Sequence, residues 1–246
     1  MSESHTFTHR YAGPPFAVNG GHLAGVLAEK AGLSRAHVEF VRPVPLDAPV
    51  QVDAADGGAR VQHQGILLAE ASPASLLHDA SPAVDWKTAA SAARRVDSTG
   101  HPFPLCYVCG PDRGHGDGLH LQPGEVSPGL VATVWLPTAD QTHGCGAVPL
   151  RVVTAALDCP SAFAFLGRAE AALLAAMTFE VRRLPRVGER VVVTGSLRSA
   201  RGRKAWATTT LATAEGETIG RAGNLWIRVD ADRIAAMGTR LTSEAA

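Results

Sequence analysis

Residues 19–32 read NGGHLAGVLAEKAG, and this stretch decides the kind of fold that the chain can adopt. Apolar residues recur at helical spacing from Leu23 to Ala31, which predicts a helix of about three turns. Asn19 is a suitable N-cap residue for this helix, and Gly32 is a suitable stop. We therefore expect one short helix early in the chain.

Strand-forming sequence follows this helix. The segments VEFVRPVPLDAPVQVDA (38–54), ARVQHQ (59–64) and ILLAEASPASLL (66–77) are separated by glycine-containing turns. Alternating and β-branched residues between such turns are typical of antiparallel strands. The first half of the chain therefore reads as one helix followed by a sheet.

The second half repeats this order. The stretch VPLRVVTAALDCPSAFAFL (148–166) predicts a second helix, with Pro149 near its first turn and Pro160 ending or kinking it. A strand at 130–137 precedes this helix, and several strands follow it from residue 177. A shift of 140 residues places Val41-Arg42 on Val181-Arg182 and Pro45 on Pro185, which indicates an internal duplication.

The duplication divides the chain into two units and two connecting segments. We expect an N-terminal unit at 1–80 and a C-terminal unit at 105–230. The linker at 81–104 is rich in Ala, Ser and Pro and has room for one short helix. Residues 231–246 form a tail, predicted as a short helix with a frayed end.

Composition and charge exclude several classes of protein. Of the 246 residues, 46% are hydrophobic and 19% are charged, which is typical of a globular protein. The 23 basic and 23 acidic residues cancel, so we expect neither nucleic acid nor an anionic membrane surface as a partner. The start, MSESHTFTHR, lacks the apolar segment of a secretory signal, and we expect a cytoplasmic protein.

The order of helices and strands, taken with three motifs, resembles the double-hotdog acyl-CoA thioesterase-like superfamily. The motifs are NGGHLAGVLA with VRPVPLDAPVQV, CYVCGPDRGHGDGLHL at 106–121, and GAVPLRVVTAALDCP at 146–160. The resemblance implies an α+β protein with a tandem (double) hotdog fold, in which each of two central helices is wrapped by a curled antiparallel sheet. It also implies an acyl-CoA or other acyl thioester as the substrate and no cofactor. A homodimer is compatible with this fold but is not required by it.

Asp158 is the best candidate for the catalytic group. It lies in the apolar stretch AALDCPSAFAF, where a carboxylate is costly to bury unless it is hydrogen-bonded or functional. The resemblance implies that this acid acts as general base or nucleophile opposite the oxyanion donors of the other helix. Those donors and the acyl-contacting residues would be Asn19, Gly20, Gly21, His22 and Phe163. The structural alternatives are tight packing at the glycines and an Asp158 that satisfies free N–H groups.

Two further polar residues are candidates for supporting roles. Asn224, on the last long strand, would position the attacking water, and Thr154, one turn before Asp158, would hydrogen-bond to it. Either residue also has an ordinary structural interpretation. Glu29 lies one position away from the place that Asp158 occupies in the second helix, and it is interpreted as a solvated residue or as part of a degenerate second site.

Several departures from the family pattern leave open an alternative without catalysis. The second helix begins Val148-Pro149-Leu150-Arg151, without the glycines of an oxyanion site, and His143-Gly144-Cys145-Gly146 lies too far upstream to replace them. The chain would then be a non-catalytic module that binds an acyl or aromatic thioester.

Two of the cysteines have part of the sequence pattern of a zinc site. Cys106-x-x-Cys109 has suitable spacing, with His101, His115 and His120 nearby, but no second Cys-x-x-Cys completes four ligands. We therefore predict a structural turn and no bound metal.

Overall fold

The computed structural model describes residues 3–75, 79–142, 146–167 and 169–244. Its first helix, α1 (Gly20–Ala31), begins and ends where the sequence predicts. The Asn19 side chain accepts a hydrogen bond from the His22 N–H at the start of the helix, and Gly32 ends it in the left-handed conformation at φ 68°. The three-turn helix is therefore fixed by local signals at both ends.

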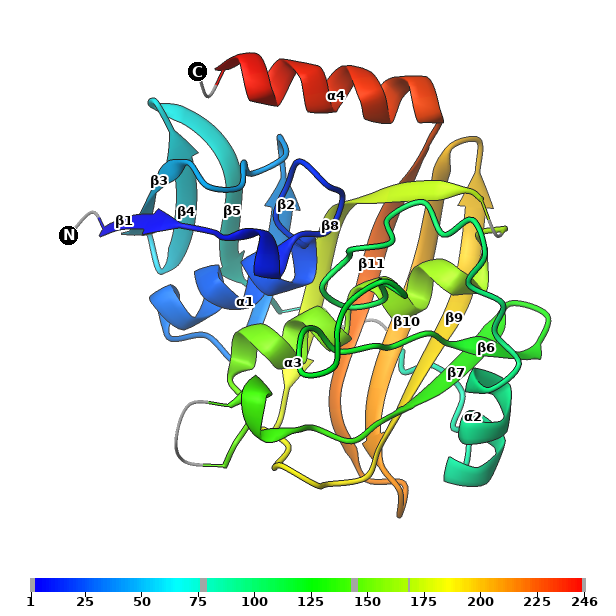
Figure 1. The fold of residues 1–246 in the computed structure, drawn as a ribbon. Coiled ribbons are helices and arrows are strands. Elements are labelled where there is room, and N and C mark those ends of the chain that lie inside the picture. The colour runs from blue at the N-terminus through cyan, green and yellow to red at the C-terminus, as the bar shows by residue number, and fades with distance from the viewer. Residues whose placement is uncertain (1–2, 76–78, 143–145, 168, 245–246) are drawn as a thin grey trace.

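The strands of the first half form a curled antiparallel sheet behind α1 (Figure 1). The strand-forming segment 38–54 is divided between two strands, because the chain leaves the sheet between Phe40 and Pro49. The strands are β1 (Glu3–Thr6), β2 (Arg35–Phe40), β3 (Pro49–Ala55), β4 (Gly58–His63) and β5 (Ile66–Pro73).

The second half contains a shorter helix and longer strands. Helix α3 (Leu150–Ala156) ends just before Asp158, and Pro160 lies in the 3₁₀ helix η3 (Cys159–Ala164) that follows. The predicted stop near Pro160 is thus confirmed. The strands are β6 (Gly124–Ser127), β7 (Leu130–Trp135), β8 (Ala171–Val181), β9 (Val191–Arg201), β10 (Lys204–Thr213) and β11 (Thr218–Val229).

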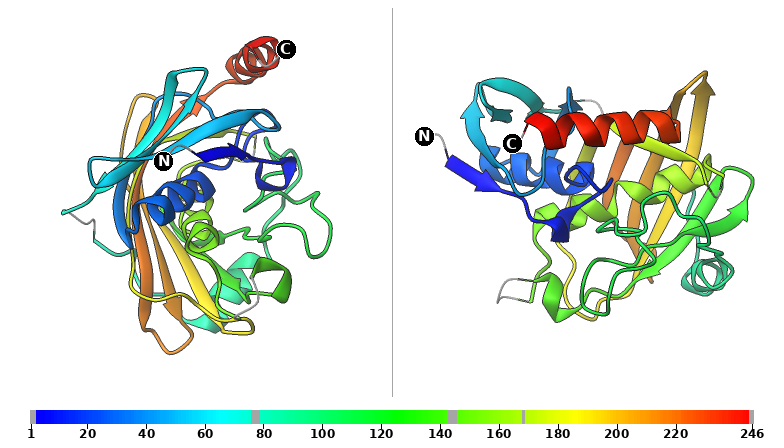
Figure 2. Two further views of the ribbon diagram at one scale, coloured as in Figure 1. Left: turned by 90° about the vertical axis from the view of Figure 1, so that its left-hand side faces the viewer. Right: turned by 45° about the horizontal axis from the view of Figure 1, so that its top comes forward.

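All these strands belong to one sheet, in the order β1-β3-β4-β5-β2-β8-β11-β10-β9-β7-β6. Read outward from its centre, the order is β2-β5-β4-β3-β1 on one side and β8-β11-β10-β9-β7 on the other. The two sides therefore have the same topology, and they meet at the antiparallel pair of β2 and β8. The two helices α1 and α3 lie side by side on the concave face (Figure 2).

Equivalent hydrogen bonds correct the alignment of the two halves by one residue. The Val18 N–H donates to the Val44 carbonyl at 3.0 Å, and the Val148 N–H donates to the Pro185 carbonyl at 2.9 Å. Pro185 is thus the equivalent of Val44, and the predicted match of Pro45 with Pro185 is wrong. The strand offset is 141 residues, whereas the helix offset is 130 because the extra 3₁₀ helix η3 follows α3.

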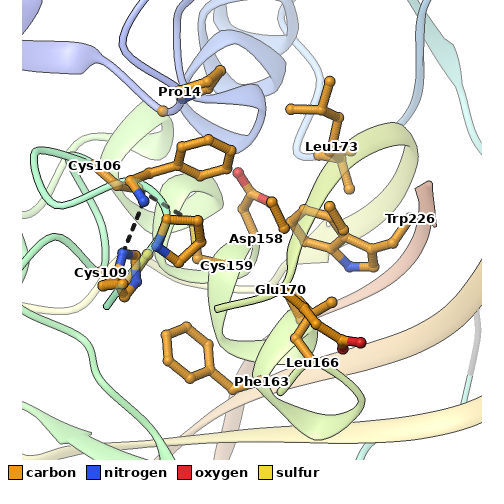
Figure 3. A pocket seen from close by; sticks show the side chains of 18 of the residues that line it. Pro14, Cys106, Cys109, Asp158, Cys159, Phe163, Leu166, Glu170, Leu173 and Trp226 are labelled. Carbon is orange, nitrogen blue, oxygen red and sulfur yellow. Dashed lines mark hydrogen bonds between the residues drawn. The ribbon is translucent and has the colours of Figure 1, made fainter. Parts of the chain in front are cut away.

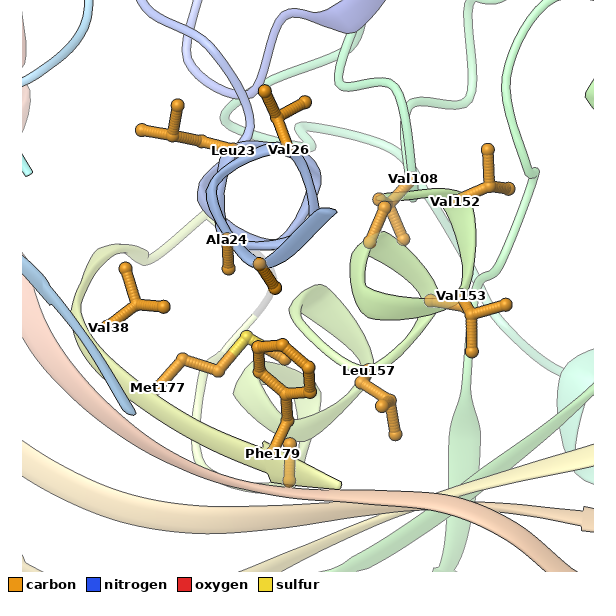
Figure 4. Packing of buried hydrophobic residues seen from close by; sticks show 14 of the residues in the cluster. Leu23, Ala24, Val26, Val38, Val108, Val152, Val153, Leu157, Met177 and Phe179 are labelled. Carbon is orange, nitrogen blue, oxygen red and sulfur yellow. The ribbon is translucent and has the colours of Figure 1, made fainter. Parts of the chain in front are cut away.

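The core is continuous across the two halves (Figure 4). Val38 of β2 and Met177 of β8 are fully buried in the same cluster, between α1 and the sheet. Leu157 and Phe179 extend this cluster beneath α3. One core therefore supports both helices and holds the end of α3 against the sheet.

Two more helices lie outside this core. Helix α2 (Trp86–Ala93) occupies the predicted linker and packs on β7 and β9 through buried Ala89. Helix α4 (Ala231–Glu244) forms most of the tail and lies outside the sheet (Figures 1 and 2). In the part of the chain that the structure describes, no helix is long and apolar enough to cross a membrane.

Candidate active site

Asp158 lies in the turn between α3 and η3 and is directed at the first turn of α1. One carboxylate oxygen, Oδ2, accepts hydrogen bonds from the Gly21 N–H at 2.8 Å and from Asn19 Nδ2 at 2.9 Å. These two donors come from the other half of the chain. A buried carboxylate at a helix N-terminus is stabilised by free N–H groups and by the positive end of the helix dipole.

The second oxygen of Asp158 has a different environment. Oδ1 is buried and finds no hydrogen-bond partner among the described residues. Burial raises the pKa of Asp158 to about 7, although the Gly21 N–H and the Asn19 amide act in the opposite direction. The carboxyl group therefore exchanges its proton near neutral pH, and it has one free acceptor oxygen.

Asn19 connects the helix start to this carboxylate. Its side-chain oxygen accepts from the His22 N–H at 2.9 Å, while its amide nitrogen donates to Asp158. An ordinary N-cap residue uses only the oxygen. The cap of α1 thus also fixes the orientation of the Asp158 side chain.

Glu29 makes the reciprocal contact at the start of α3. Its carboxylate accepts from the Arg151 N–H at 3.1 Å and from Arg151 Nε at 2.7 Å. Gly21 and Arg151 are both the second residue of their helix, so each helix receives a carboxylate from the other at the same position. Glu29 is therefore a partly exposed residue whose charge is compensated by Arg151, rather than one that interacts with solvent alone. Asp158 has no such cation beside it among the described residues.

A cavity of about 280 Å³ opens beside Asp158 (Figure 3). Residues of both halves line it, including Asn19 and Gly20 at the start of α1. Its walls are mostly apolar, and the predicted Phe163 is among them. The other large apolar side chains in the wall include Pro14, Phe103, Leu166, Leu173, Leu174 and Trp226.

The glycines of α1 also have a packing role. A Cβ at Gly21 would lie 2.5 Å from the Asp158 Cβ, and a Cβ at Gly25 would lie 2.2 Å from the Arg151 Cα. These contacts are far too short for real atoms. Gly21 therefore has two roles: it allows the two helices to pack closely, and this close approach lets its N–H donate a hydrogen bond to Asp158.

Two predicted site residues, Asn224 and Thr154, do not line the cavity. Asn224 Nδ2 donates to the Leu157 carbonyl and to Ser161 Oγ, both at 2.9 Å, and so braces the turn between α3 and η3 from the sheet side. The Thr154 hydroxyl donates to the Leu150 carbonyl at 3.0 Å rather than to Asp158. The expected bond from Thr154 to Asp158 is therefore not formed.

The side chain of His22 also points away from the cavity. Its ring stacks on Tyr11, with centroids 4.0 Å apart, and meets the edge of Tyr107. Burial lowers the pKa of His22 to about 3, and the charge of Arg151 adds to this effect. His22 is a neutral core residue, and its contribution to the site is the backbone N–H that completes the cap.

Three cysteines meet at the wall of the same cavity. The sulfur atoms of Cys106, Cys109 and Cys159 lie within 4.8 Å of one another, and all three residues are buried. Hydrogen bonds with the Cys109 and Cys159 thiols hold the pKa of Cys106 well below its usual range. The sequence pattern does not connect Cys159 with Cys106, because 53 residues separate them. The position of Cys159 directly after Asp158 was the one sequence feature that could have indicated a place in the site.

Of the other groups considered with the cysteines, His101 lines the same cavity, whereas His120 is not among its lining residues. His101 Nδ1 accepts from the Phe103 N–H at 3.1 Å, and His120 Nε2 pairs with the Gly114 carbonyl at 3.2 Å. The segment His143-Gly144-Cys145, which lies upstream of the second helix, is outside the described residues.

Comparison with known proteins identifies the fold. No family model matches the chain, and no curated protein matches it. Among solved structures, the tesB protein of Mycobacterium avium subs paratuberculosis is 16% identical, with 93% of each chain covered and a TM-score of 0.62. An acyl-CoA thioesterase II, TesB2, from Mycobacterium marinum is 14% identical, with 93% of each chain covered and a TM-score of 0.58.

A conserved protein with a hot dog fold from Alicyclobacillus acidocaldarius is 12% identical, with 93% of each chain covered and a TM-score of 0.61. At such identities the likeness is one of fold. The chain has the hotdog fold of TesB-like thioesterases over nearly its whole length, and the resemblance predicted from the sequence is confirmed at that level.

Proposed function

We propose that this chain is a tandem pair of hotdog units that hydrolyses an acyl thioester, with Asp158 as the general base. One observation carries the proposal: the buried Asp158 residue lines an apolar cavity and its Oδ2 is held by Asn19 and Gly21, while its Oδ1 finds no hydrogen-bond partner among the described residues. The shared topology of the two sides of the sheet supports the tandem arrangement.

The residues of the site divide the reaction between them. Asp158 Oδ1 accepts a proton from a water molecule as the water oxygen attacks the thioester carbonyl carbon. Gly20 is the first residue of α1, so its N–H has no acceptor within the helix and can donate to the developing oxyanion. When the C–S bond breaks, the proton on Asp158 passes to the leaving thiolate. The products are a carboxylic acid and a thiol, and Asp158 is regenerated.

The cavity limits the acyl group that can bind. Pockets for small molecules usually measure roughly 300–1,000 Å³, and this cavity, at about 280 Å³, lies just below that range. Its wall contains the aromatic rings of Phe103, Phe163 and Trp226. We expect short or aromatic acyl groups to be preferred over long chains, with the coenzyme A portion outside the cavity.

The test is hydrolysis of a panel of short, medium, long and aromatic acyl-CoAs, followed by release of free thiol. Asp158→Asn keeps the size of the side chain and removes the base, so kcat should fall by ~100-fold or more. Glu29→Gln is the matched control, because it removes the reciprocal carboxylate at the other helix start and should leave kcat unchanged. Equal losses in both variants would show that the caps are structural and would contradict the proposed role of Asp158.

A single turnover in ¹⁸O-labelled water distinguishes a general base from a nucleophile. With Asp158 as base, the label enters the product acid only. Label recovered in the Asp158 side chain would show an anhydride intermediate and would overturn the general-base assignment. Binding of acyl-CoAs without any turnover would instead support the alternative of a non-catalytic thioester-binding module.

A further inference from the structure

We propose that Cys106, Cys109 and Cys159 form a binding site for a thiophilic divalent cation, Zn²⁺ in the first instance, with a fourth coordination position open to the cavity. The site adjoins the carboxylate that carries the proposed hydrolysis, since Cys159 directly follows Asp158 and both line one cavity, but the inference does not depend on that activity. It rests on where the fold brings the three sulfur atoms together.

The spacing of the sulfur atoms fits a metal site. A Zn–S distance of ~2.3 Å and tetrahedral angles place two thiolate sulfurs about 3.8 Å apart. Cys106 Sγ and Cys159 Sγ are 3.6 Å apart, and all three sulfurs lie within 4.8 Å of one another. A disulfide requires about 2.05 Å between two sulfur atoms, and it would leave the third thiol unused.

The backbone that carries these cysteines is well defined. Cys106 and Cys109 lie on one tight turn, closed by a hydrogen bond from the Gly110 N–H to the Cys106 carbonyl at 2.9 Å. Any side chain at Gly110 would collide with this turn, because a Cβ there would lie 2.6 Å from the Cys106 nitrogen. Cys159 is held from the opposite side, at the start of η3. The ligands thus come from two rigid segments, as in structural and catalytic metal sites.

A neighbouring group supports a thiolate ligand at this place. Asn19 Nδ2 lies 3.5 Å from Cys159 Sγ in hydrogen-bond geometry, and the start of α1 is at the same end of the cavity. Donors outside the coordination shell orient the ligands of a metal and tune its affinity. All three cysteines line the cavity, so the position that three protein ligands leave vacant is accessible to water or to a small ligand.

The experiment uses the full chain, reduced and freed of metal with a chelator. Titration with Co²⁺ should give thiolate-to-cobalt charge-transfer bands and the visible bands of tetrahedral cobalt, saturating at one equivalent per chain. Zn²⁺ should displace the cobalt at the same stoichiometry. X-ray absorption of the zinc-loaded protein should show three sulfur neighbours and one lighter atom around the zinc. This measurement uses the wild-type protein and so does not depend on whether a variant folds.

Variants assign the ligands. Cys106→Ser, Cys109→Ser and Cys159→Ser should each weaken binding strongly, whereas Cys145→Ser, at the remaining cysteine of the sequence, should retain one equivalent. Fewer than three sulfur neighbours in the wild type, or metal retained in Cys159→Ser and lost in Cys145→Ser, would overturn the assignment. So would a failure to bind metal after reduction, combined with recovery of a Cys106–Cys159 or Cys106–Cys109 disulfide from the protein purified without reductant.

Discussion

Two carboxylates in equivalent positions have opposite electrostatic environments. Glu29 pairs with the Arg151 guanidinium and is partly exposed, whereas Asp158 is 1% exposed and is held by uncharged donors only. Burial of a charge without a compensating cation disfavours the ionised form. Burial without a compensating cation explains why the pKa of Asp158 is raised to about 7, a value suited to acid–base chemistry near neutral pH.

His22 should make the protein sensitive to acid. Its pKa is lowered from 6.5 to about 3 in the folded state, so below pH 6.5 the unfolded chain binds a proton that the folded chain does not. The contribution of His22 to the free energy of unfolding should therefore decrease by about 1.4 kcal/mol per pH unit as the pH falls from 6.5 towards 3.

Denaturant unfolding of the wild type and of His22→Phe across this pH range measures the effect. The difference between the two proteins cancels the contribution of Asp158, whose raised pKa acts in the opposite direction. Relative to the wild type, His22→Phe should gain stability as the pH falls from 6.5 towards 3, because it lacks the group that favours the unfolded chain in acid. Parallel pH curves would contradict a neutral, buried His22.

At the scale of elements, the two central helices approach so closely that glycine is needed at their contact. A Cβ at Gly25 would lie 2.2 Å from the Arg151 Cα and 2.3 Å from Thr154 Oγ1, in the middle of the crossing. The gain in helix propensity from alanine is about 1 kcal/mol at most. The steric conflict with backbone atoms therefore outweighs it.

Gly25→Ala should destabilise the protein by about 1–3 kcal/mol, as overpacking of a close contact does. Thermal unfolding monitored by circular dichroism would show this as a lowered Tm. Gly114→Ala is the matched control, since a Cβ there meets nothing within 4 Å and the backbone is not left-handed. A Tm unchanged by Gly25→Ala would show that the helices can separate without cost.

The Glu29 contact should contribute to stability but not to turnover. Glu29→Gln removes the ion pair with Arg151 and weakens the hydrogen bond to the start of α3, which should cost about 1 kcal/mol. The measurement is the free energy of unfolding at low and at high salt. The loss should shrink at high salt, because the pair is partly exposed and screened.

Short sequence patterns predicted where the helices begin and end, but they predicted only part of the candidate active site. The cap at Asn19, the stop at Gly32 and the break near Pro160 are properties of a few neighbouring residues, so they could be predicted. The pairing of Glu29 with Arg151 spans 122 residues and depends on how the helices cross. The meeting of Cys106 with Cys159 likewise depends on tertiary structure, for which spacing gives no signal.

At the scale of the whole molecule, the two halves share their sheet and their core. Arg35 of β2 reaches across to Glu180 of β8, and Glu180 also pairs with Arg221 at 3.3 Å. Val38 and Met177, from the same two strands, pack in one cluster with α1. Alone, the first half would expose the edge of β2 and the second half the edge of β8, and each would expose part of the apolar face of its helix.

The chain should therefore unfold in a single cooperative transition. Calorimetry of the full protein should give one peak with equal calorimetric and van't Hoff enthalpies. The fragments 1–80 and 105–230, expressed separately, should lack the sharp thermal transition of the whole chain. Two resolved transitions in the full chain, matching those of folded fragments, would contradict this prediction.

Arg151 occupies the place in α3 that Gly21 occupies in α1. Two units can carry different residues at equivalent positions when both are encoded in one polypeptide. Two identical protomers related by a twofold axis carry the same residue at both positions, so they keep either both sites or neither. Covalent fusion breaks that symmetry. In this chain the Asp158 carboxylate is held by uncharged donors, whereas the Glu29 carboxylate forms an ion pair with Arg151 that joins the two helices. We expect one ligand per chain, where a symmetric pair of the same size would bind two.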